Sequence, residues 1–440
     1  MRNVISKPID AFVSTRNKLS FKKIERLKND LRGREPKEPY SELENLTRKK
    51  NAFLRSAAAW ELALWHADKY TKDDAKQCLY YLGIMRVPVA ENQPMRQAVL
   101  RAESYRLTEK TAKATELVDN LLDKEPRSDL FLAKANLTND YPKKVEIINK
   151  AFALLNIKPI GKITDAQLQP YNQLKNIAIK HINKSPLVTV IVPAYNSEDT
   201  IATAITSLQN QTWQNLEIIV VDDNSTDGTT NIVEGFAKKD SRIKLIKQSK
   251  NQGPYIARNT ALQQANGEFV TTNDADDWSH QQKIQWQAEH LIKNSEVLGN
   301  TSQQVRADNQ LDFYRRGNRG FYIQTNISSF MFRREAVIEK IGFWDSVRFG
   351  ADSEYIERLQ SAQGKDSVVH LENALLSFQR FSSSSLTGNT TSGFDGYYRG
   401  DRLIYKKAYE KWHKENSGNI KLDFPLDERP FAVPDKMKTG

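Results

Sequence analysis

Leu187-Val-Thr-Val-Ile-Val192 is a continuous run of apolar and β-branched residues that follows a break in the helical pattern at Lys184-Ser-Pro186. Such a run is expected of a strand that is buried on both faces, as in a parallel sheet. Further along the chain, similar short runs alternate with helical patterns. The predicted strands are 216–221, 243–247 and 269–272, and the predicted helices are 199–209, 229–238 and 255–265. This alternation predicts an α/β domain with a mainly parallel sheet and right-handed crossovers.

Polar loops follow three of these predicted strands at the point where each strand ends. The loops are Pro193–Asp199, Asp222–Gly228 and Asn273–Trp278. Sheets of this kind bind ligands in the crevice at the carboxyl ends of their strands. We therefore expect the three loops to form one site.

The third loop, Asn273-Asp-Ala-Asp-Asp-Trp278, holds three carboxylates within four positions. Carboxylates this close repel one another, and a hard divalent cation is their usual neutraliser, since it takes oxygen ligands and also binds phosphate. An isolated acidic triplet is more often a solvated turn. The two other polar loops at the same edge favour a metal site here, with Asp276 and Asp277 as ligands.

The residue types around this cluster suggest a nucleotide diphosphate as ligand. Asp223 can accept a hydrogen bond from a uracil N3–H or a ribose hydroxyl, and Tyr195 offers an aromatic surface. Carboxylates alone would repel a diphosphate, so a metal is required by the electrostatics. Arg258 can bind the diphosphate or pair with the acidic cluster. Asn196 and Ser197 can also cap the following helix.

Residues 1–184 have a helical pattern, with apolar residues at three- and four-residue spacing. The predicted helices are 52–66, 73–82, 94–122, 128–137 and 143–155, and two Ala-containing motifs near 102 and 133 suggest degenerate tetratricopeptide-like repeats. Residues 1–185 contain 35 Lys+Arg and 22 Asp+Glu, whereas the rest of the chain is nearly neutral. A basic N-terminal region beside a nearly neutral one suggests that the basic region binds an anionic partner. The alternative is that its positive charges form a solvated helical face with no partner.

The composition is that of a globular protein with two or three domains in 440 residues. No apolar run reaches the length needed to span a bilayer, and the N-terminus lacks the apolar core of a signal peptide. A single cysteine, Cys78, excludes an intrachain disulfide and fits a reducing compartment. We expect a cytoplasmic protein, peripheral at the inner face of the cell membrane if the basic part binds lipid.

Three motifs identify a family resemblance: VIVPAYNSEDTI at 190–201, IIVVDDNSTDGT at 218–229 and NQGPYIARNTALQQANGEFVTTNDADDW at 251–278. In this order and spacing they resemble a family 2 glycosyltransferase with the GT-A fold, over residues 186–380. The resemblance implies an inverting transferase that uses a nucleotide-sugar donor, commonly a UDP-sugar, with Mn2+ or Mg2+. It implies metal ligation by Asp276 and Asp277 and a donor site that comprises Pro193, Tyr195, Asn196, Glu198, Asp223, Arg258, Asp274 and Asp276.

The same resemblance assigns the general base. The segment Phe349–Leu359 is similar to the family's Gly-Glu-Asp motif, which places Asp352 as the base, with Ala351 where a Glu is usual. Glu354 is the reserve candidate. On the acceptor side the resemblance implies Trp344, Arg348 and Arg380. Ser382 stands where the family often has a histidine, which leaves a third protein ligand of the metal in doubt, and the segment 382–400 is expected to be a mobile lid or a linker.

These observations predict three parts: a basic all-helical domain at 1–184, a GT-A glycosyltransferase domain at 185–400 and a C-terminal helical tail at 401–440. The expected partners are a nucleotide-sugar donor and a saccharide or lipid-linked saccharide acceptor in bacterial capsule, lipopolysaccharide or other surface polysaccharide synthesis. The basic domain is expected to contact an anionic membrane surface or a protein partner, and no nucleic acid is expected. The alternative is a non-catalytic scaffold with a GT-A-like binding module.

Overall fold

The computed structural model describes residues 15–33, 36–90, 92–165, 167–177, 181–182, 186–315, 320–381, 400–416 and 418–439. These residues form two compact units. The first holds the described residues up to Asp140 together with Arg315 and Gly320–Tyr322, and the second holds the others. No helix among the described residues combines the length and the apolar character needed to cross a membrane.

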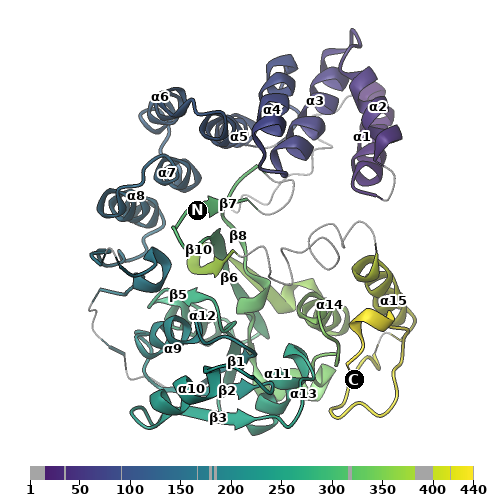
Figure 1. Ribbon diagram of the computed structural model, residues 1–440. Coiled ribbons are helices and arrows are strands. Elements are labelled where there is room, and N and C mark those ends of the chain that lie inside the picture. The colour runs from purple at the N-terminus through teal and green to yellow at the C-terminus, as the bar shows by residue number, and fades with distance from the viewer. Residues whose placement is uncertain are drawn as a thin grey trace. The chain divides into compact units, whose positions relative to one another are not determined.

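The first unit consists of stacked α-helices, as predicted (Figure 1). Its core contains buried residues such as Leu43, Trp60 and Leu62. Cys78 is fully buried, and burial raises the pKa of its thiol to about 11. The helices are α1 (Thr15–Leu31), α2 (Lys37–Leu46), α3 (Ala52–Ala67), α4 (Lys72–Ile84), α5 (Gln93–Leu107), α6 (Thr111–Leu122) and α7 (Ser128–Ala135).

Two details of the first unit differ from the sequence prediction. The single helix predicted at 94–122 is two helices, because the chain turns between them at Glu109, whose φ of 62° is left-handed. A segment distant in sequence also belongs to this unit: the buried Arg315 guanidinium pairs with Glu103 at 2.5 Å and Asp68 at 3.0 Å. The unit is therefore closed by a piece of chain that comes from the second half of the sequence.

The second unit begins with α8 (Tyr141–Leu154). This start lies well before residue 184, where the sequence analysis placed the end of the helical domain. The described residues of 155–184 contain no α-helix, only the 3-10 turn η2 (Pro170–Gln173). The helical pattern predicted up to residue 184 is thus wrong after Leu154. Pro159, Gly161 and Pro170 break the helical pattern in this stretch, which packs irregularly against the sheet through side chains such as Tyr171.

The sheet of the second unit has the strand order β3-β2-β1-β4-β9-β6-β10-β5. β1, β2, β3 and β4 are parallel, which confirms the predicted α/β fold class. β6 and β10 also pair in parallel, whereas β9 is antiparallel to β4 and β6, and β5 is antiparallel to β10. β7 and β8 pair with β6. The strands are β1 (Val188–Ala194), β2 (Leu216–Asp222), β3 (Ile243–Lys247), β4 (Phe269–Thr272), β5 (Trp278–Ser279), β6 (Gly299–Ala307), β7 (Phe313–Tyr314), β8 (Gln324–Thr325), β9 (Met331–Arg333) and β10 (Val368–Arg380).

Helices cover both faces of this sheet (Figure 1). In β1, Val190 and Val192 face one core and Ile191 faces the other, which explains the unbroken apolar run in the sequence. One face is covered by α9 (Ile201–Gln209), α10 (Thr229–Ala237) and α12 (Lys283–Lys293), and the other by α11 (Pro254–Gln264), α13 (Arg334–Ile341) and α14 (Ala351–Gln363).

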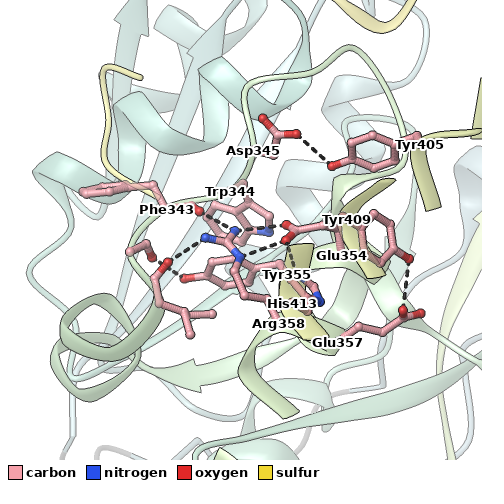
Figure 2. A network of polar contacts seen from close by, with 12 residues as sticks. Phe343, Trp344, Asp345, Glu354, Tyr355, Glu357, Arg358, Tyr405, Tyr409 and His413 are labelled. Carbon is pink, nitrogen blue, oxygen red and sulfur yellow. Dashed lines mark hydrogen bonds and ion pairs between the residues drawn. The ribbon is translucent and has the colours of Figure 1, made fainter. Parts of the chain in front are cut away.

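The C-terminal helix α15 (Asp401–Glu415) packs on α14 through a buried polar network (Figure 2). Arg358 and Glu354 form a fully buried ion pair at 2.9 Å, and His413 of α15 contacts the same carboxylate at 3.0 Å. Arg358 also donates to the main-chain oxygens of Ile341 and Phe343. Removing one partner would leave a buried charge uncompensated, so this network fixes α14 firmly against the unit's core.

Candidate active site

Arg258 of α11 joins two parts of the predicted site. Its guanidinium donates to Asp352 Oδ1 at 2.5 Å and to Asp274 Oδ1 at 2.7 Å, and the arginine is only 2% exposed. Asp274 belongs to the acidic loop after β4, and Asp352 lies in the first turn of α14. One cation therefore holds the predicted general base next to the predicted metal motif. Of the two roles considered for Arg258, the structure shows the pairing with the carboxylates.

Asp352 is held in place from two sides. Besides Arg258, Tyr255 donates its hydroxyl hydrogen to Asp352 Oδ2 at 2.9 Å, and the Asp352 main-chain N–H donates to the same tyrosine oxygen at 3.2 Å. Burial raises the pKa of Asp352 above its usual range, although the charge of Arg258 opposes this. A carboxylate with a raised pKa is a better proton acceptor, which suits a general base.

The acidic loop itself is buried to different degrees. Asp277 is 4% exposed, and its Oδ1 accepts the main-chain N–H of Arg380 at 3.0 Å, whereas Asp276 is half-buried. Burial and the neighbouring carboxylates raise the pKa of both groups, that of Asp276 to about 6. The strand end thus concentrates negative charge that a cation would stabilise.

Lys283 at the start of α12 lies behind this loop and was not predicted. Its ammonium group is buried and donates to Ser279 Oγ at 3.2 Å and to Asn273 Oδ1 at 3.4 Å. Burial lowers the pKa of Lys283 to about 8, while Asp277 and Asp274 oppose that shift. No local sequence pattern marked this lysine, because the buried face of α12 also includes the polar Gln287.

The donor set of the acidic loop fits a hard divalent ion. Asp276 and Asp277 offer carboxylate oxygens, and Asp274 is engaged by Arg258. Among the residues that the structure describes, no three His, Cys, Asp or Glu side chains form a metal-binding group. Mg2+ commonly binds one or two carboxylates and completes its shell with water and substrate phosphate, so two aspartates are sufficient ligands for such an ion. Ser382, where a third ligand was considered, and the segment that follows it lie outside the described residues.

Asp223, at the end of β2, shapes the loop that precedes α11. Its two carboxylate oxygens accept the main-chain N–H groups of Gln252 at 2.8 Å and Gly253 at 2.7 Å. Each oxygen keeps a second lone pair with which a ligand can be bound. Arg348 lies on this side of the site: its charge lowers the pKa of Asp223, against the larger effect of burial, and it donates to Asn251 at 3.4 Å. The acceptor-side role of Arg348 stays a prediction.

The loop after β1 is tied to the loop after β2. Asn196 Oδ1 accepts the Thr226 N–H at 2.9 Å, and Glu198 Oε2 accepts the Gly228 N–H at 2.7 Å. Asn196 therefore fixes this loop rather than capping α9, whose N-cap is Thr200. Tyr195 is 48% exposed, so its ring is available to a ligand, and Pro193 is buried in β1.

Two further predicted site residues lie in the core instead (Figure 2). Glu354 is fully buried and engaged by Arg358 and His413, so it cannot serve as a reserve base. It is two residues from Asp352, and such neighbours on a helix do not share a face. Trp344 is 3% exposed and stacks on Tyr355 with ring centroids 4.7 Å apart, so its ring fills the core and is not open to an acceptor.

Arg380, predicted on the acceptor side, is buried against the acidic loop. Its guanidinium donates to the Asp276 main-chain oxygen at 3.2 Å and lies 3.9 Å from the centre of the Tyr171 ring. These contacts with the acidic loop were not predicted, because sequence spacing does not show that β10 ends beside the loop after β4. The structure thus brings together Asp274, Asp276, Asp277, Arg258 and Asp352, with Asp223 and Tyr195 at neighbouring strand ends.

Comparisons with known proteins agree with this arrangement. The pattern described as "Glycosyl transferase family 2" matches residues 189–348. The chain is 28% identical over 242 residues to an uncharacterized glycosyltransferase of Haemophilus influenzae, covering 51% of this chain and 93% of that protein. It is 40% identical over 124 residues to the UDP-Glc:alpha-D-GlcNAc-diphosphoundecaprenol beta-1,3-glucosyltransferase WfgD of Escherichia coli, covering 26% of this chain and 48% of WfgD.

Among solved structures, the mannosyltransferase PcManGT of Pyrobaculum calidifontis in complex with GDP-Man and Mn2+ is similar over 57% of this chain and 68% of that one, at 20% identity and a TM-score of 0.35. The matched residues 189–348 include the three strand-end loops that form the site described above. Residues 189–348 of this chain are therefore a glycosyltransferase family 2 domain, which follows an N-terminal region of stacked helices.

Proposed function

We propose that this protein transfers a sugar from a UDP-sugar to an acceptor hydroxyl, with inversion at the anomeric carbon. The observation that carries the proposal is the bridge formed by Arg258, which holds Asp352 and Asp274 on one guanidinium. An inverting transferase needs a base near the anomeric carbon and a neutralised diphosphate beside it. The bridge supports the proposal because it holds the Asp352 carboxylate close to the acidic loop that is proposed to bind the metal.

The donor is proposed to lie across the strand ends of β1, β2 and β4. The exposed ring of Tyr195 and the free lone pairs of Asp223 suit a uracil base and its ribose. Arg348 adds a positive charge on the same side. A Mn2+ or Mg2+ ion held by Asp276 and Asp277 would neutralise charge on the diphosphate leaving group. The donor named for WfgD is also a UDP-sugar.

In the proposed reaction, Asp352 accepts the proton of the acceptor hydroxyl as its oxygen forms a bond to the anomeric carbon. The bond between that carbon and the diphosphate oxygen breaks, and UDP leaves with the electron pair. Arg258 and Tyr255 keep the Asp352 carboxylate oriented during this step. The acceptor is proposed to be a lipid-linked saccharide in bacterial surface polysaccharide synthesis, since WfgD is named for a diphosphoundecaprenol acceptor.

We expect nucleotide sugars to stabilise the protein against thermal unfolding in the presence of Mn2+. A ligand that binds only the native state at 100 times its Kd adds about 2.7 kcal/mol, which corresponds to a rise of about 5 °C in Tm for a domain of this size. A screen of UDP-, GDP- and dTDP-sugars by thermal shift measures this, with a chelator in place of Mn2+ as control. The proposal is contradicted if no UDP-sugar changes the Tm.

The excess positive charge before residue 186 is proposed to bring the enzyme to an anionic membrane surface that carries the acceptor. We expect the full chain to float with vesicles that contain anionic phospholipid at low salt, and to remain unbound at high salt. Neutral vesicles are the control. Absence of binding to anionic vesicles at low salt would rule out the membrane role and leave a protein partner.

A further inference from the structure

We infer that η2, which precedes the family 2 domain in sequence, positions the Asp276–Asp277 motif through Tyr171 and Asn172. The metal role of that motif rests on the proposed function, whereas the bracing contacts are features of this chain. Pro170–Gln173 lies before β1 and outside the matched residues 189–348. Its side chains nevertheless reach the acidic loop at the end of β4 from the side of β10.

Tyr171 links the main chain of the acidic loop to the main chain of β10. Its side chain is fully buried, and its hydroxyl accepts the N–H of Trp278 at 3.1 Å while donating to the main-chain oxygen of Phe378. The Trp278 N–H belongs to the peptide bond that Asp277 forms with the next residue. Asn273 Nδ2 donates to the oxygen of the same peptide at 3.2 Å. Both polar atoms of this peptide are therefore fixed, and with them the direction of the Asp277 side chain.

Asn172 acts through Arg380. The Arg380 guanidinium donates to Asn172 Oδ1 at 2.6 Å, to Asn309 Oδ1 at 2.5 Å and to the Asp276 main-chain oxygen at 3.2 Å, and it lies over the Tyr171 ring. All these acceptors are uncharged, so they hold the guanidinium without cancelling its charge. The Arg380 N–H also binds Asp277 Oδ1.

These contacts connect η2 to both aspartates by separate routes. Tyr171 fixes the peptide that follows Asp277. Asn172 fixes the Arg380 side chain. The main-chain N–H of Arg380 binds the Asp277 carboxylate, and its guanidinium binds the main-chain oxygen of Asp276. Residues that orient metal ligands in this way typically contribute about 10- to 100-fold to metal affinity. Tyr171 and Asn172 are therefore positioning residues: neither side chain is a ligand, and both set the geometry of the ligands.

Tyr171→Phe tests this inference, because it removes the hydroxyl and keeps the ring under Arg380. We expect amide hydrogen exchange in the peptide that contains Asn273–Trp278 to become about tenfold faster in the metal-free protein, since the Trp278 N–H loses its acceptor. We also expect the Kd for Mn2+, measured from the EPR signal of free Mn2+, to rise at least about tenfold. Tyr409→Phe is the matched control, since it removes a buried tyrosine hydroxyl that contacts Glu357 on α14.

The outcomes separate this inference from the proposed function. Faster exchange at 273–278 in Tyr171→Phe, with wild-type exchange there in Tyr409→Phe, supports the bracing role even if the wild type binds no Mn2+. Absence of Mn2+ binding by the wild type would contradict the proposed metal site alone. Unchanged exchange at 273–278 and an unchanged Kd for Mn2+ in Tyr171→Phe would overturn the inference. Equal acceleration in both variants would also overturn it, because the effect would then be a general loss of stability.

Discussion

Asp352→Asn is expected to lower kcat for sugar transfer by about 10²- to 10⁴-fold, the usual contribution of a positioned general base. The amide cannot accept the acceptor proton, whereas its oxygen can still accept the hydrogen bond from Arg258 that now reaches Asp352 Oδ1 at 2.5 Å. The fold should therefore remain, and the KM for the donor should change little, since Asp352 is proposed to act on the acceptor. Steady-state kinetics with varied UDP-sugar measure both constants.

Asp366→Asn is a suitable control for this variant. Asp366 is exposed in the short turn that follows α14, so the substitution removes one carboxylate close in sequence to Asp352 but away from Arg258. We expect its kcat to equal that of the wild type. If Asp352→Asn keeps kcat within a few-fold of the wild type, another group must accept the proton. Glu354 is not that group, because Arg358 and His413 enclose its carboxylate.

The sheet was predictable because its central strands are continuous apolar runs in the sequence. β1 and β2 are buried on both faces, so they contain few polar residues, and the polar loops that follow them mark the ligand-binding edge. The strand-end loops or the family resemblance predicted four carboxylates as site residues: Asp223, Asp276, Asp277 and Asp352. The pairing of Arg258 with two carboxylates that are 78 positions apart in sequence depends on how α11, β4 and α14 pack, which no local pattern encodes.

The position of Trp344 was hard to predict for a related reason. A tryptophan near a site can stack on a sugar or fill the core, and only the packing of α14 shows that Trp344 lies against Tyr355. η2 was likewise assigned to a helical domain, because the apolar spacing of residues 1–184 does not show that the chain after Leu154 packs irregularly against the sheet. Tyr171, Asn172 and Lys283 had no functional signature of their own in the sequence.

Asp277→Asn is expected to lower the rate of metal-dependent sugar transfer by at least about 100-fold, because a proposed direct ligand loses its charge. The substitution is nearly isosteric, and the amide oxygen can still accept the Arg380 N–H that now binds Asp277 Oδ1 at 3.0 Å. It also removes one of three clustered negative charges. The metal-free variant should therefore unfold at a temperature no lower than the wild type, which thermal unfolding in the presence of a chelator measures.

The release of UDP from a UDP-sugar, followed with the wild type and Asp277→Asn at equal concentrations and with Mn2+ or a chelator, tests the central claim most directly. The donor is the UDP-sugar that gives the largest thermal shift. We predict that the wild type releases UDP only with Mn2+ and that Asp277→Asn shows at most about one hundredth of that rate. Equal rates in the two proteins, or the same rate with the chelator, would contradict the assignment of the Asn273–Trp278 loop as the metal motif of a glycosyltransferase.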